Sequence, residues 1–446
     1  MTGFFAPPDD ARYALRNLRA PACLVAGELP SAADPYGILA LDLVVDDGRI
    51  AAIAPPGSIP AELGPDLDRA MVLPGLIDAH AHLDKCHIWP RMTNPDGSHG
   101  GAAAAVAEDR RLNWTAEDVR ARMSFALQCA YARGVVAIRT HIDSLAPQGG
   151  ISFPVFRRMR DEWAGRIEMQ CSSIVPWEVF QRPDEAAELA DLVAASSGNL
   201  GLSVRLSGRD PRAPQPDFEA AMERFFTLAI DRGLNIDLHV DECGEQGSSA
   251  LIRVARMARA RGFKGTLLCG HCCALSIQED DFVTETLNAC AEAGVDIVSL
   301  PLVNMYLQNR AAGVTPRWRG VTIVHEMRAR GLRVAIAGDN ARDPFYAYGD
   351  HDMLETFTQS VRIAHLDMPV GDWMRTVTDI PAAIMQLPDA GMIRTGTPAN
   401  LLVLKARSYS ELLARFQADR VVIRHGKAID TTPPDFRALD PIVGAP

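Results

Sequence analysis

The chain has 446 residues, enough for one large α/β domain and a smaller one. Its net charge is −11, with 56 Asp+Glu against 45 Lys+Arg, which argues against nucleic acid or an anionic membrane as a partner. The first residues include acids and no long apolar stretch, so we do not expect them to be a secretory signal. No apolar run reaches the length of a membrane span. Nine cysteines in apolar contexts favour reduced thiols, so we expect a cytoplasmic protein, and we also expect a homo-oligomer.

Both ends of the chain predict short β-strands. Residues 41–45 and 50–54 are apolar runs separated by Asp46-Asp47-Gly48-Arg49, a hairpin signal. Residues 399–404 and 420–424 repeat this pattern near the other end. Neither end can bury a core alone, so residues 1–70 and 393–446 are predicted to form one small β-sandwich domain.

Strand-like and helix-like segments alternate between these ends. The first strand signal is Met71 to His82, and helix-like Ala116 to Arg133 precedes the second, Val135 to His141. Eight strand signals occur in all, the last ending at Asp339. Repeated βα units specify a parallel sheet, and eight of them predict a (β/α)8 TIM barrel over residues 71–392. A doubly wound open sheet is the alternative, but no Gly-x-Gly-x-x-Gly follows any strand.

The sequence Asp78-Ala79-His80-Ala81-His82 is the strongest chemical signal in the chain. Side chains alternate along a strand, so His80 and His82 point to the same face. Their imidazoles can therefore bind one cation together. His-x-His alone is a weak motif, and the remaining strand ends must support it.

Barrel enzymes place their catalytic groups at the carboxyl ends of the strands. Five of the eleven histidines lie at such ends in this sequence, with acids beside them; they are His80, His82, His141 (followed by Asp143), His239 (followed by Asp241 and Glu242) and His271. Asp339 ends the last strand. His80, His82, His239 and Asp339 are predicted to bind one divalent transition ion and to leave a position open for water.

This arrangement predicts hydrolysis. The metal would lower the pKa of its water, so that hydroxide attacks the substrate at neutral pH. Glu242 follows His239 by three residues and is predicted to carry a proton from the water to the leaving group. His271 is predicted to orient the water or polarise the reacting centre, and Asp339 to accept a hydrogen bond from the water as well as bind the metal.

Five blocks of the sequence resemble the cytosine deaminase group of the amidohydrolase superfamily. They are PGLIDAHAHLDK, LHVDE, GHCCAL, PLVNMYLQNR and GDNARDPFYAYGDHDML, and the resemblance runs from about Val72 to Met353. It implies one metal ion per chain, iron or zinc, held by the four ligands above, with Glu242 and His271 as acid/base residues. It also implies that the segment from Gln170 to Trp177, and Asn340, meet the ring of a small heterocyclic substrate.

Two departures from that family argue against cytosine itself. Pro176-Trp177-Glu178 stands where the cytosine deaminases carry a glutamine that reads the pyrimidine edge, and Asn340 replaces the second member of an acidic pair. Trp177 offers only one N–H donor, so it is predicted to stack on a different ring. The alternative is that Trp177 packs against a neighbouring helix. Asn304 either lines the pocket or caps its loop.

Two reactions fit these residues. The first is hydrolytic deamination of an amino-substituted nitrogen heterocycle or cyclic amidine, with release of ammonia. The second is a mononuclear cyclic amidohydrolase that cleaves another C–N bond of a heterocycle, releasing an amide or an N-alkylamine. A binuclear site bridged by a carboxylated lysine is disfavoured, because no lysine lies between Lys85 and Lys264.

Several further residues resemble functional ones but have simpler explanations. Cys269 and Cys272 form a C-x-x-C, which we interpret as packed thiols because no second pair exists. Histidines 87, 99 and 351 are expected to be solvated loop residues. Arg205 either binds an anionic group or neutralises barrel carboxylates.

Overall fold

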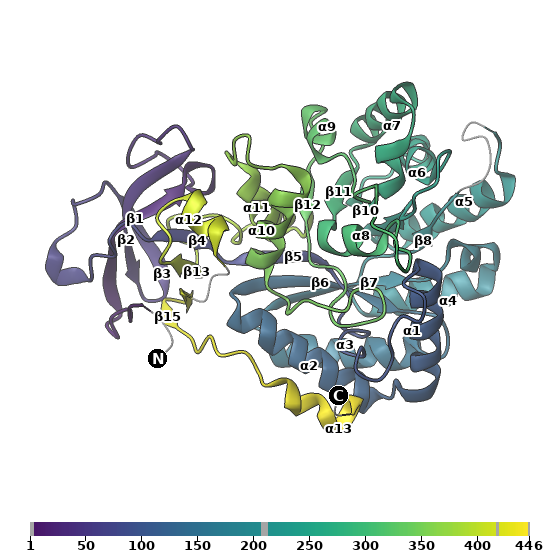
Figure 1. Cartoon of the computed structure of the whole chain (residues 1–446), viewed down its shortest axis with the longest axis horizontal. Coiled ribbons are helices and arrows are strands. Elements are labelled where there is room, and N and C mark those ends of the chain that lie inside the picture. Colours follow the sequence, from purple (N-terminus) through teal and green to yellow (C-terminus); the bar gives the residue numbers. More distant parts are fainter. Residues whose placement is uncertain (1–3, 207–212, 416–418, 445–446) are drawn as a thin grey trace.

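The computed structural model describes residues 4–206, 213–415 and 419–444. Figure 1 shows two parts, a β-rich domain that contains the N-terminal strands and a larger α/β domain. We call them the terminal domain and the barrel.

The terminal domain is built on one seven-stranded sheet in the order β15-β14-β13-β4-β1-β2-β3. Its strands are β1 (Arg12–Pro21), β2 (Ile38–Asp46), β3 (Arg49–Ala54), β4 (Met71–Pro74), β13 (Leu401–Leu404), β14 (Arg420–Arg424) and β15 (Lys427–Ala428). The sheet curls so that Ala399 N–H donates to Gly48 O at 2.8 Å and Ile50 N–H donates to Thr397 O at 3.0 Å. A separate apolar core lies between its two halves. The prediction that both chain ends form one small β domain is confirmed.

Eight parallel strands form the barrel. They are β5 (Leu76–Ala81), β6 (Val135–Asp143), β7 (Glu168–Ile174), β8 (Ser203–Val204), β9 (Ile236–Val240), β10 (Leu267–His271), β11 (Asp296–Ser299) and β12 (Val334–Ile336). Strands β5 to β7 form one hydrogen-bonded sheet and β8 to β12 another. Parallel bridges between Pro176 and Ser203, and between Ala81 and Asp339, connect these sheets into a ring. The predicted (β/α)8 barrel is therefore confirmed.

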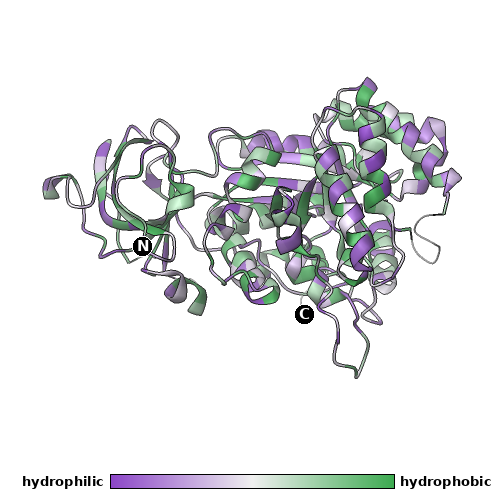
Figure 2. Ribbon diagram, turned by 90° about the horizontal axis from the view of Figure 1, so that it is seen from above, coloured by the Kyte–Doolittle hydropathy of each residue, from purple (hydrophilic) through white to green (hydrophobic). Residues whose placement is uncertain are grey.

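Helices surround the barrel, and Figure 2 shows hydrophilic and hydrophobic residues mixed along them. The α-helices are α1 (His99–Asn113), α2 (Ala116–Ala132), α3 (Gly149–Trp163), α4 (Pro183–Ala195), α5 (Pro216–Asp231), α6 (Ala250–Ala260), α7 (Asp280–Ala293), α8 (Pro301–Leu307), α9 (Val324–Ala329), α10 (Met353–Ala364), α11 (Asp379–Ile384), α12 (Tyr409–Ala414) and α13 (Asp440–Val443). Short 3-10 helices are η1 (Ala22–Leu24), η2 (Ala61–Leu63), η3 (Trp177–Gln181), η4 (Cys273–Ile277), η5 (Trp373–Val377) and η6 (Phe436–Leu439).

The first strand signal, expected over Met71 to His82, is two strands in two different sheets. β4 pairs with β1 and β13 of the terminal domain, whereas β5 pairs with β6 of the barrel. Pro74 and Gly75 separate them, because proline has no N–H to donate to a ladder. Hydrogen bonding thus places Met71–Pro74 with the terminal domain, while the division at 70/71 and 392/393 stays a prediction.

The last described residues return to the barrel. Figure 1 shows the C-terminal segment running from the terminal domain to α13, close to α2. Leu439 and Val443 share a buried cluster with Phe125 and Cys129 of α2. The final residues of the range 393–446 predicted for the terminal domain thus find apolar partners on a barrel helix, and the bounds of that domain stay a prediction.

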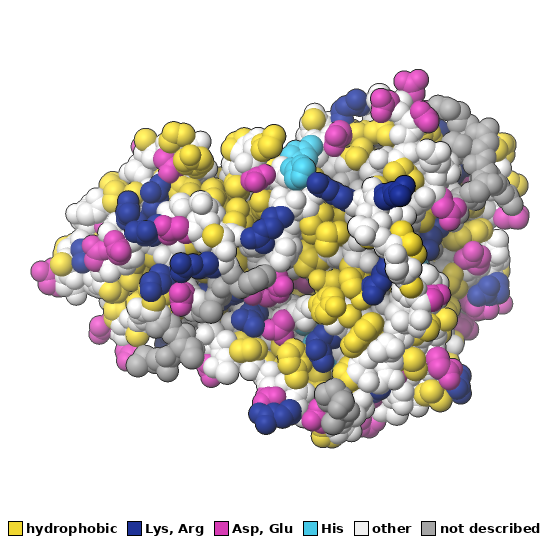
Figure 3. All heavy atoms as spheres, viewed as in Figure 1, with side chains coloured by type: hydrophobic (Ala, Val, Ile, Leu, Met, Phe, Trp, Pro, Cys, Tyr) yellow, Lys and Arg dark blue, Asp and Glu magenta, His cyan; other side chains and the backbone are white. Residues whose placement is uncertain are grey.

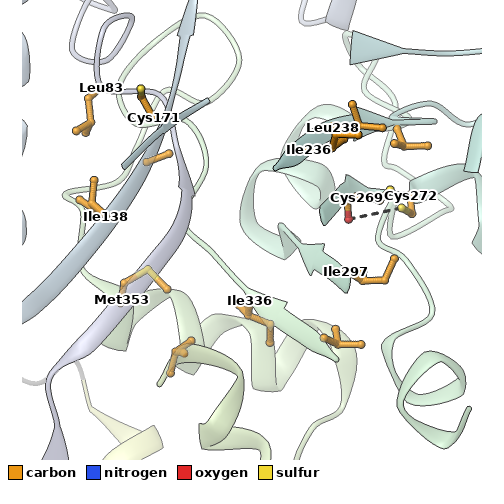
Figure 4. Close-up of a cluster of buried hydrophobic side chains, with 14 of the residues drawn as sticks. Leu83, Ile138, Cys171, Ile236, Leu238, Cys269, Cys272, Ile297, Ile336 and Met353 are labelled. Carbon is orange, nitrogen blue, oxygen red and sulfur yellow. Dashed lines mark hydrogen bonds between the residues drawn. The ribbon is translucent and has the colours of Figure 1, made fainter. Parts of the chain in front are cut away.

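Branched apolar side chains fill the space between the barrel strands and their helices. Figure 4 shows part of this core, including Ile138, Leu238, Ile297 and Ile336, which are fully buried. Cys269 and Cys272 lie in the same core, both free and both 0% exposed. This placement agrees with their interpretation as packed thiols.

Charged side chains of both signs are interspersed on the face shown in Figure 3. Such mixing gives no broad positive field for a nucleic acid on that face. Over the described part of the chain, the helices lack the combination of length and apolar composition that a membrane span requires.

Buried ion pairs fix α2 against the loop that follows β5. Arg122 is fully buried, donates to Asp118 Oδ2 at 2.6 Å, and donates to the carbonyl oxygens of Asp84 and Cys86 at 2.5 and 3.1 Å. Arg91 donates to the same Asp118 carboxylate at 2.5 Å. The loop next to the predicted ligands is thus held by charge-assisted hydrogen bonds.

We expect Asp118→Asn to lower the free energy of unfolding by about 3 kcal/mol, because it leaves the buried Arg122 charge uncompensated. Burial raises the pKa of Asp118, but hydrogen bonds and charge from Arg91 and Arg122 outweigh it, so the pKa is below its ordinary value. The stabilisation is therefore present at neutral pH and lost as the pH falls through that lowered pKa. Urea unfolding at pH 7 and at low pH measures both effects. Asp161→Asn, on an exposed carboxylate, should change stability by less than about 0.5 kcal/mol.

Candidate functional site

The four predicted metal ligands meet at the carboxyl end of the barrel. His239 Nε2 lies 3.2 Å from His80 Nε2 and 3.1 Å from His82 Nε2. Asp339 Oδ1 lies 3.2 Å from His82 Nε2 and 3.6 Å from His80 Nε2. These side chains come from β5, β9 and the end of β12, and each is at most 5% exposed. The structure thus brings together the four residues that the sequence singled out.

Local backbone features make this convergence possible. A side chain at Gly270 on β10 would place its Cβ 3.1 Å from His80 Cε1, so glycine leaves the room that the imidazole occupies. Asp78 accepts a hydrogen bond from Gly338 N–H at 3.0 Å, which ties the start of the His-x-His segment to the residue before Asp339. Asp339 itself has a φ of 65°, a left-handed conformation that is unusual for a residue other than glycine.

The donor set fits a cation. Among the described residues, neither carboxylate oxygen of Asp339 has a hydrogen-bond partner. Burial, together with the nearby Glu242 carboxylate, raises the pKa of Asp339 well above its ordinary value. The ionised form of Asp339 is therefore unfavourable unless a positive charge lies beside it. Three imidazole nitrogens facing this carboxylate are the ligands expected of a catalytic transition-metal site. His271 also lies close enough to count among the potential ligands.

His141 contacts the His80 imidazole at Nδ1, the ring nitrogen that does not face His239. His141 Nε2 lies 3.1 Å from His80 Nδ1 and 3.7 Å from Asp237 Oδ1. If His80 Nδ1–H donates to His141, the lone pair of His80 Nε2 is free to bind a metal, an arrangement common around ligating histidines. Asp237 Oδ2 accepts a hydrogen bond from the buried Arg139 guanidinium at 3.2 Å. This existing positive charge disfavours a second cation between His141 and Asp237.

Glu242 lies beside the ligand cluster and does not need to bind the metal. Its Oε2 is 3.2 Å from His99 Nε2 and 3.8 Å from the Arg205 guanidinium. Its Oε1 is 3.5 Å from His271 Nδ1. Burial raises the pKa of Glu242, but the polar groups that face it, His271, His99 and the Arg205 guanidinium, hold the pKa below its ordinary value. Glu242 is therefore a carboxylate in the resting site, which is the form that a general base requires.

His271 is held as a neutral imidazole. Burial lowers its pKa to about 4, although the Glu242 carboxylate opposes this shift. The amide nitrogen of Asn304 donates to His271 Nδ1 at 3.0 Å and lies 3.4 Å from Glu242 Oε1. With Nδ1 accepting, His271 carries its proton on Nε2, which has no hydrogen-bond partner in the described ranges. Asn304 thus positions both predicted acid/base residues.

A cavity of about 230 Å³ opens onto this cluster. His82, His239, Glu242, His271, Asp339 and Asn340 line its floor, and the walls include Val106, Leu145, Ile174, Val175, Pro176 and Phe345. Mostly apolar walls with a few convergent polar groups are typical of small-molecule sites. The amide nitrogen of Asn340 already donates to Asp343 at 2.6 Å, which leaves its oxygen for other contacts.

Three charged residues, Lys85, Arg110 and Asp143, line one part of the cavity. The Asp143 carboxylate accepts from Arg110 at 2.9 Å and lies 3.6 Å from the buried Lys85 ammonium. Lys85 also lies over the ring of Phe345, 5.2 Å from its centroid. These residues can offer both hydrogen-bond donors and acceptors to a planar polar ring.

Three of the four predicted substrate contacts, Trp177, Gln170 and Asn304, are not among the side chains that line the cavity in the described structure. Trp177 begins η3 and packs edge-on against Phe218 of α5, with ring centroids 5.3 Å apart. Gln170 donates to Met385 O at 2.7 Å and accepts from Arg139 at 2.9 Å, and it lies four residues before Ile174, the β7 residue that lines the cavity. The side chains of Trp177 and Gln170 thus have their partners elsewhere in the barrel wall, and a substrate-binding role for either residue stays a prediction.

We expect Trp177→Phe to leave kcat/KM for the true substrate within about twofold, since the ring lies outside the cavity. The loss of packing against Phe218 should lower the free energy of unfolding by about 1 kcal/mol. Steady-state kinetics and urea unfolding separate these effects. A large change in the relative kcat/KM values for different ring systems would show that Trp177 does contribute to substrate specificity.

Sequence reasoning missed part of the site. His99, expected to be a solvated loop histidine, starts α1 and contacts both Glu242 and Arg205. Arg110 and Val106 lie on the same helix, which was not predicted as an element. The N-cap Ser98, which accepts from Gly101 N–H at 2.9 Å, is the local signal that could have located this helix.

The chain shares this architecture with known proteins. Residues 154–429 match the Amidohydrolase family. A pterin deaminase from Rhizobium rhizogenes strain K84 is 45% identical over 443 residues, which are 99% of each chain. The chain belongs to the amidohydrolase family.

Two solved structures of amidohydrolases superpose on most of the chain. 5-Methylcytosine deaminase from Klebsiella pneumoniae, liganded with phosphonocytosine, gives a TM-score of 0.77 at 24% identity, covering 94% of this chain and 97% of that one. N-isopropylammelide isopropylaminohydrolase from Burkholderia multivorans gives 0.72 at 25% identity, covering 94% and 98%. The predicted family and the predicted reaction class, hydrolytic deamination of a heterocycle, are thus confirmed, and members of this amidohydrolase family depend on metals.

Proposed function

We propose that this amidohydrolase removes the amino group of a pterin ring and releases ammonia. The observation that carries the proposal is the 45% identity to a pterin deaminase over 99% of both chains. The cavity supports it, because its volume of about 230 Å³ and its apolar walls suit a flat one- or two-ring heterocycle. The charged group of Lys85, Arg110 and Asp143 supplies polar contacts at one side.

His80, His82, His239 and Asp339 would hold one divalent ion, zinc or iron. When bound, such an ion supplies Lewis acidity that makes a water reactive at neutral pH. The imidazoles come from rigid strands, and the His80 ring is further oriented by His141 at 3.1 Å. This support keeps the ligand geometry fixed during turnover.

The reaction adds water across the ring carbon that carries the amino group. Glu242 takes the first proton from the attacking water and passes it to the adjacent ring nitrogen, and it then takes the remaining hydroxyl proton and passes it to the amino nitrogen. His271, neutral with its Nε2 proton available, donates a hydrogen bond to the atom that gains negative charge. The new C–O bond becomes a carbonyl as the C–N bond breaks, and the nitrogen leaves as ammonia. The hydrogen bonds of Asn304 hold the His271 and Glu242 side chains in fixed positions relative to each other during the reaction.

The ring would lie between the apolar walls, with Phe345 and Val106 on its faces or edges. Lys85 and Arg110 are placed to donate to a ring oxygen, and Asp143 to accept from a ring N–H. A site built from such paired polar groups rejects rings that lack the matching edge, because its buried groups are then left unpaired. Cytosine should therefore be a poor substrate.

Ammonia release from pterin, cytosine, 5-methylcytosine and adenine tests the proposal. Metal-replete enzyme should give kcat/KM of about 10⁴ M⁻¹s⁻¹ or more for pterin. The alternative reaction, release of an N-alkylamine, is favoured by the similarity to N-isopropylammelide isopropylaminohydrolase. N-isopropylammelide belongs in the same panel, and isopropylamine release without deamination of pterin would select that alternative.

We also propose that the enzyme is cytoplasmic and homo-oligomeric. All nine cysteines are free, which suits a reducing compartment. Size-exclusion chromatography with light scattering measures the oligomeric state, and a monomer at micromolar concentration would contradict the second part.

A further inference from the structure

A second group of potential metal ligands lies on the loops that flank the catalytic cavity. Cys86 and His87 follow β5, and His351 lies between β12 and α10. Their Sγ and ring nitrogen atoms lie within 4.8 Å of one another. Cys86 and His87 are 0% exposed and His351 is 7% exposed. The expectation that these two histidines are solvated is wrong, because the two loops fold over them.

The imidazoles in this cluster lack partners. Both ring nitrogens of His87, and Nε2 of His351, have no hydrogen-bond partner within residues 4–206, 213–415 and 419–444. An unsatisfied buried polar atom costs about 1–3 kcal/mol, and native proteins contain few of them. The aromatic rings beside His87, Phe125 at 4.9 Å and Phe436 at 6.4 Å, offer it no polar atom. Three such nitrogens beside a thiol indicate a ligand that binds to all of them.

We propose that Cys86, His87 and His351 bind a structural zinc ion. Thiolate and imidazole are the ligands that zinc prefers, and soft sulfur disfavours calcium or magnesium. Binding requires the Cys86 thiol to release its proton to solvent. Burial raises the pKa of the Cys86 thiol, and the charge of the Arg122 guanidinium, which donates to the Cys86 carbonyl at 3.1 Å, opposes this shift.

A second thiol, Cys129, lies near this cluster, although its Sγ is not among the atoms that lie within 4.8 Å of one another. It is buried on α2, one helical turn after Phe125, whose ring contacts His87. Burial raises the pKa of its thiol, and the Asp350 carboxylate and the Cys86 thiol, both close by, raise it further. A bound zinc ion would offset this cost for either thiol.

The ion would join the two loops that carry the catalytic ligands. His87 N–H already donates to Ala341 O at 3.0 Å, and Trp89 N–H donates to Arg342 O at 2.8 Å. Lys85 on the first loop and Asn340 on the second line the catalytic cavity, whereas none of the three proposed zinc ligands does. The role is therefore structural, and it does not depend on which ring the enzyme deaminates.

Cobalt substitution of the full-length protein tests the site. The catalytic ligand set contains no sulfur, so a thiolate-to-cobalt charge-transfer band in the near ultraviolet can arise only from a cysteine site. We expect this band in wild type and in His239→Ala, and its loss in Cys86→Ser and His351→Gln. Zinc content by mass spectrometry should fall by one ion per chain in the latter two. Cys273→Ser is the matched control, since Cys273 is a buried thiol nearer to Glu242 and Asp339.

The proposal fails if wild-type protein with cobalt shows no thiolate band, a result that needs no variant to fold. It also fails if the band disappears in Cys273→Ser and persists in Cys86→Ser. Loss of pterin deamination with the band intact would overturn the proposed function and leave the zinc site standing.

Discussion

Glu242→Gln is expected to lower kcat by about two to four orders of magnitude while the metal content stays unchanged. The amide keeps the shape of the side chain and its contact with His99, 3.2 Å away, but it cannot accept a proton from water. Glu242 lies next to the four proposed ligands rather than among them, so the ion should remain. Single-turnover ammonia release and metal analysis on the same preparation give both numbers.

Glu245→Gln is the control for this experiment. Glu245 is an exposed carboxylate on the same loop, three residues further along, and its loss should not change kcat. If Glu242→Gln lost the metal together with activity, Glu242 would be a ligand and its role as proton carrier would be refuted.

His239→Ala is expected to remove one metal ion per chain and to abolish turnover. His239 Nε2 is within 3.2 Å of the corresponding atoms of both His80 and His82, so its imidazole is central to the ligand set. Removing one of few ligands weakens binding far more than removing a residue that supports a ligand, which typically costs 10- to 100-fold in affinity. Mass spectrometry of dialysed protein counts the ions, and zinc and iron are distinguished in the same measurement.

The exposed His365 provides the matched substitution. His365→Ala should keep both the metal and the activity. Retention of every ion by His239→Ala, with activity lost, would mean that the ion binds elsewhere and that His239 acts in another way.

The fold could be predicted from the sequence because its signals are local and repeated. The helix expected from Ala116 to Arg133 is α2, Ala116–Ala132, and its boundary follows from the N-cap Thr115. The sequence shows the break at Pro74-Gly75, but it does not show that the strands on either side of the break join different sheets. Whether β4 pairs with the terminal sheet or with the barrel depends on partners more than 300 residues away, such as Leu401–Leu404.

The proximity of the four proposed metal ligands was predictable for a related reason. The carboxyl ends of parallel strands meet at one edge, so His239 and Asp339 could be assigned to the same place as His80 and His82 without any knowledge of distances. The cavity walls could not be assigned in this way. Trp177 and His99 both lie outside the strands, and only the packing of α5 and α1 decides that the first faces Phe218 and the second faces Glu242.

The origin of the cavity residues has a consequence for how this enzyme can change its substrate. The reactive groups sit on strand ends that are locked in the barrel, while the walls come from helix α1 and from loops, at Val106, Leu145 and Phe345. Loop and helix surfaces accept substitution with little effect on the frame beneath them. A library restricted to those three positions should therefore yield variants that prefer new rings and still retain the metal ion and Glu242. Substrate selectivity in this enzyme can thus evolve separately from its reaction chemistry.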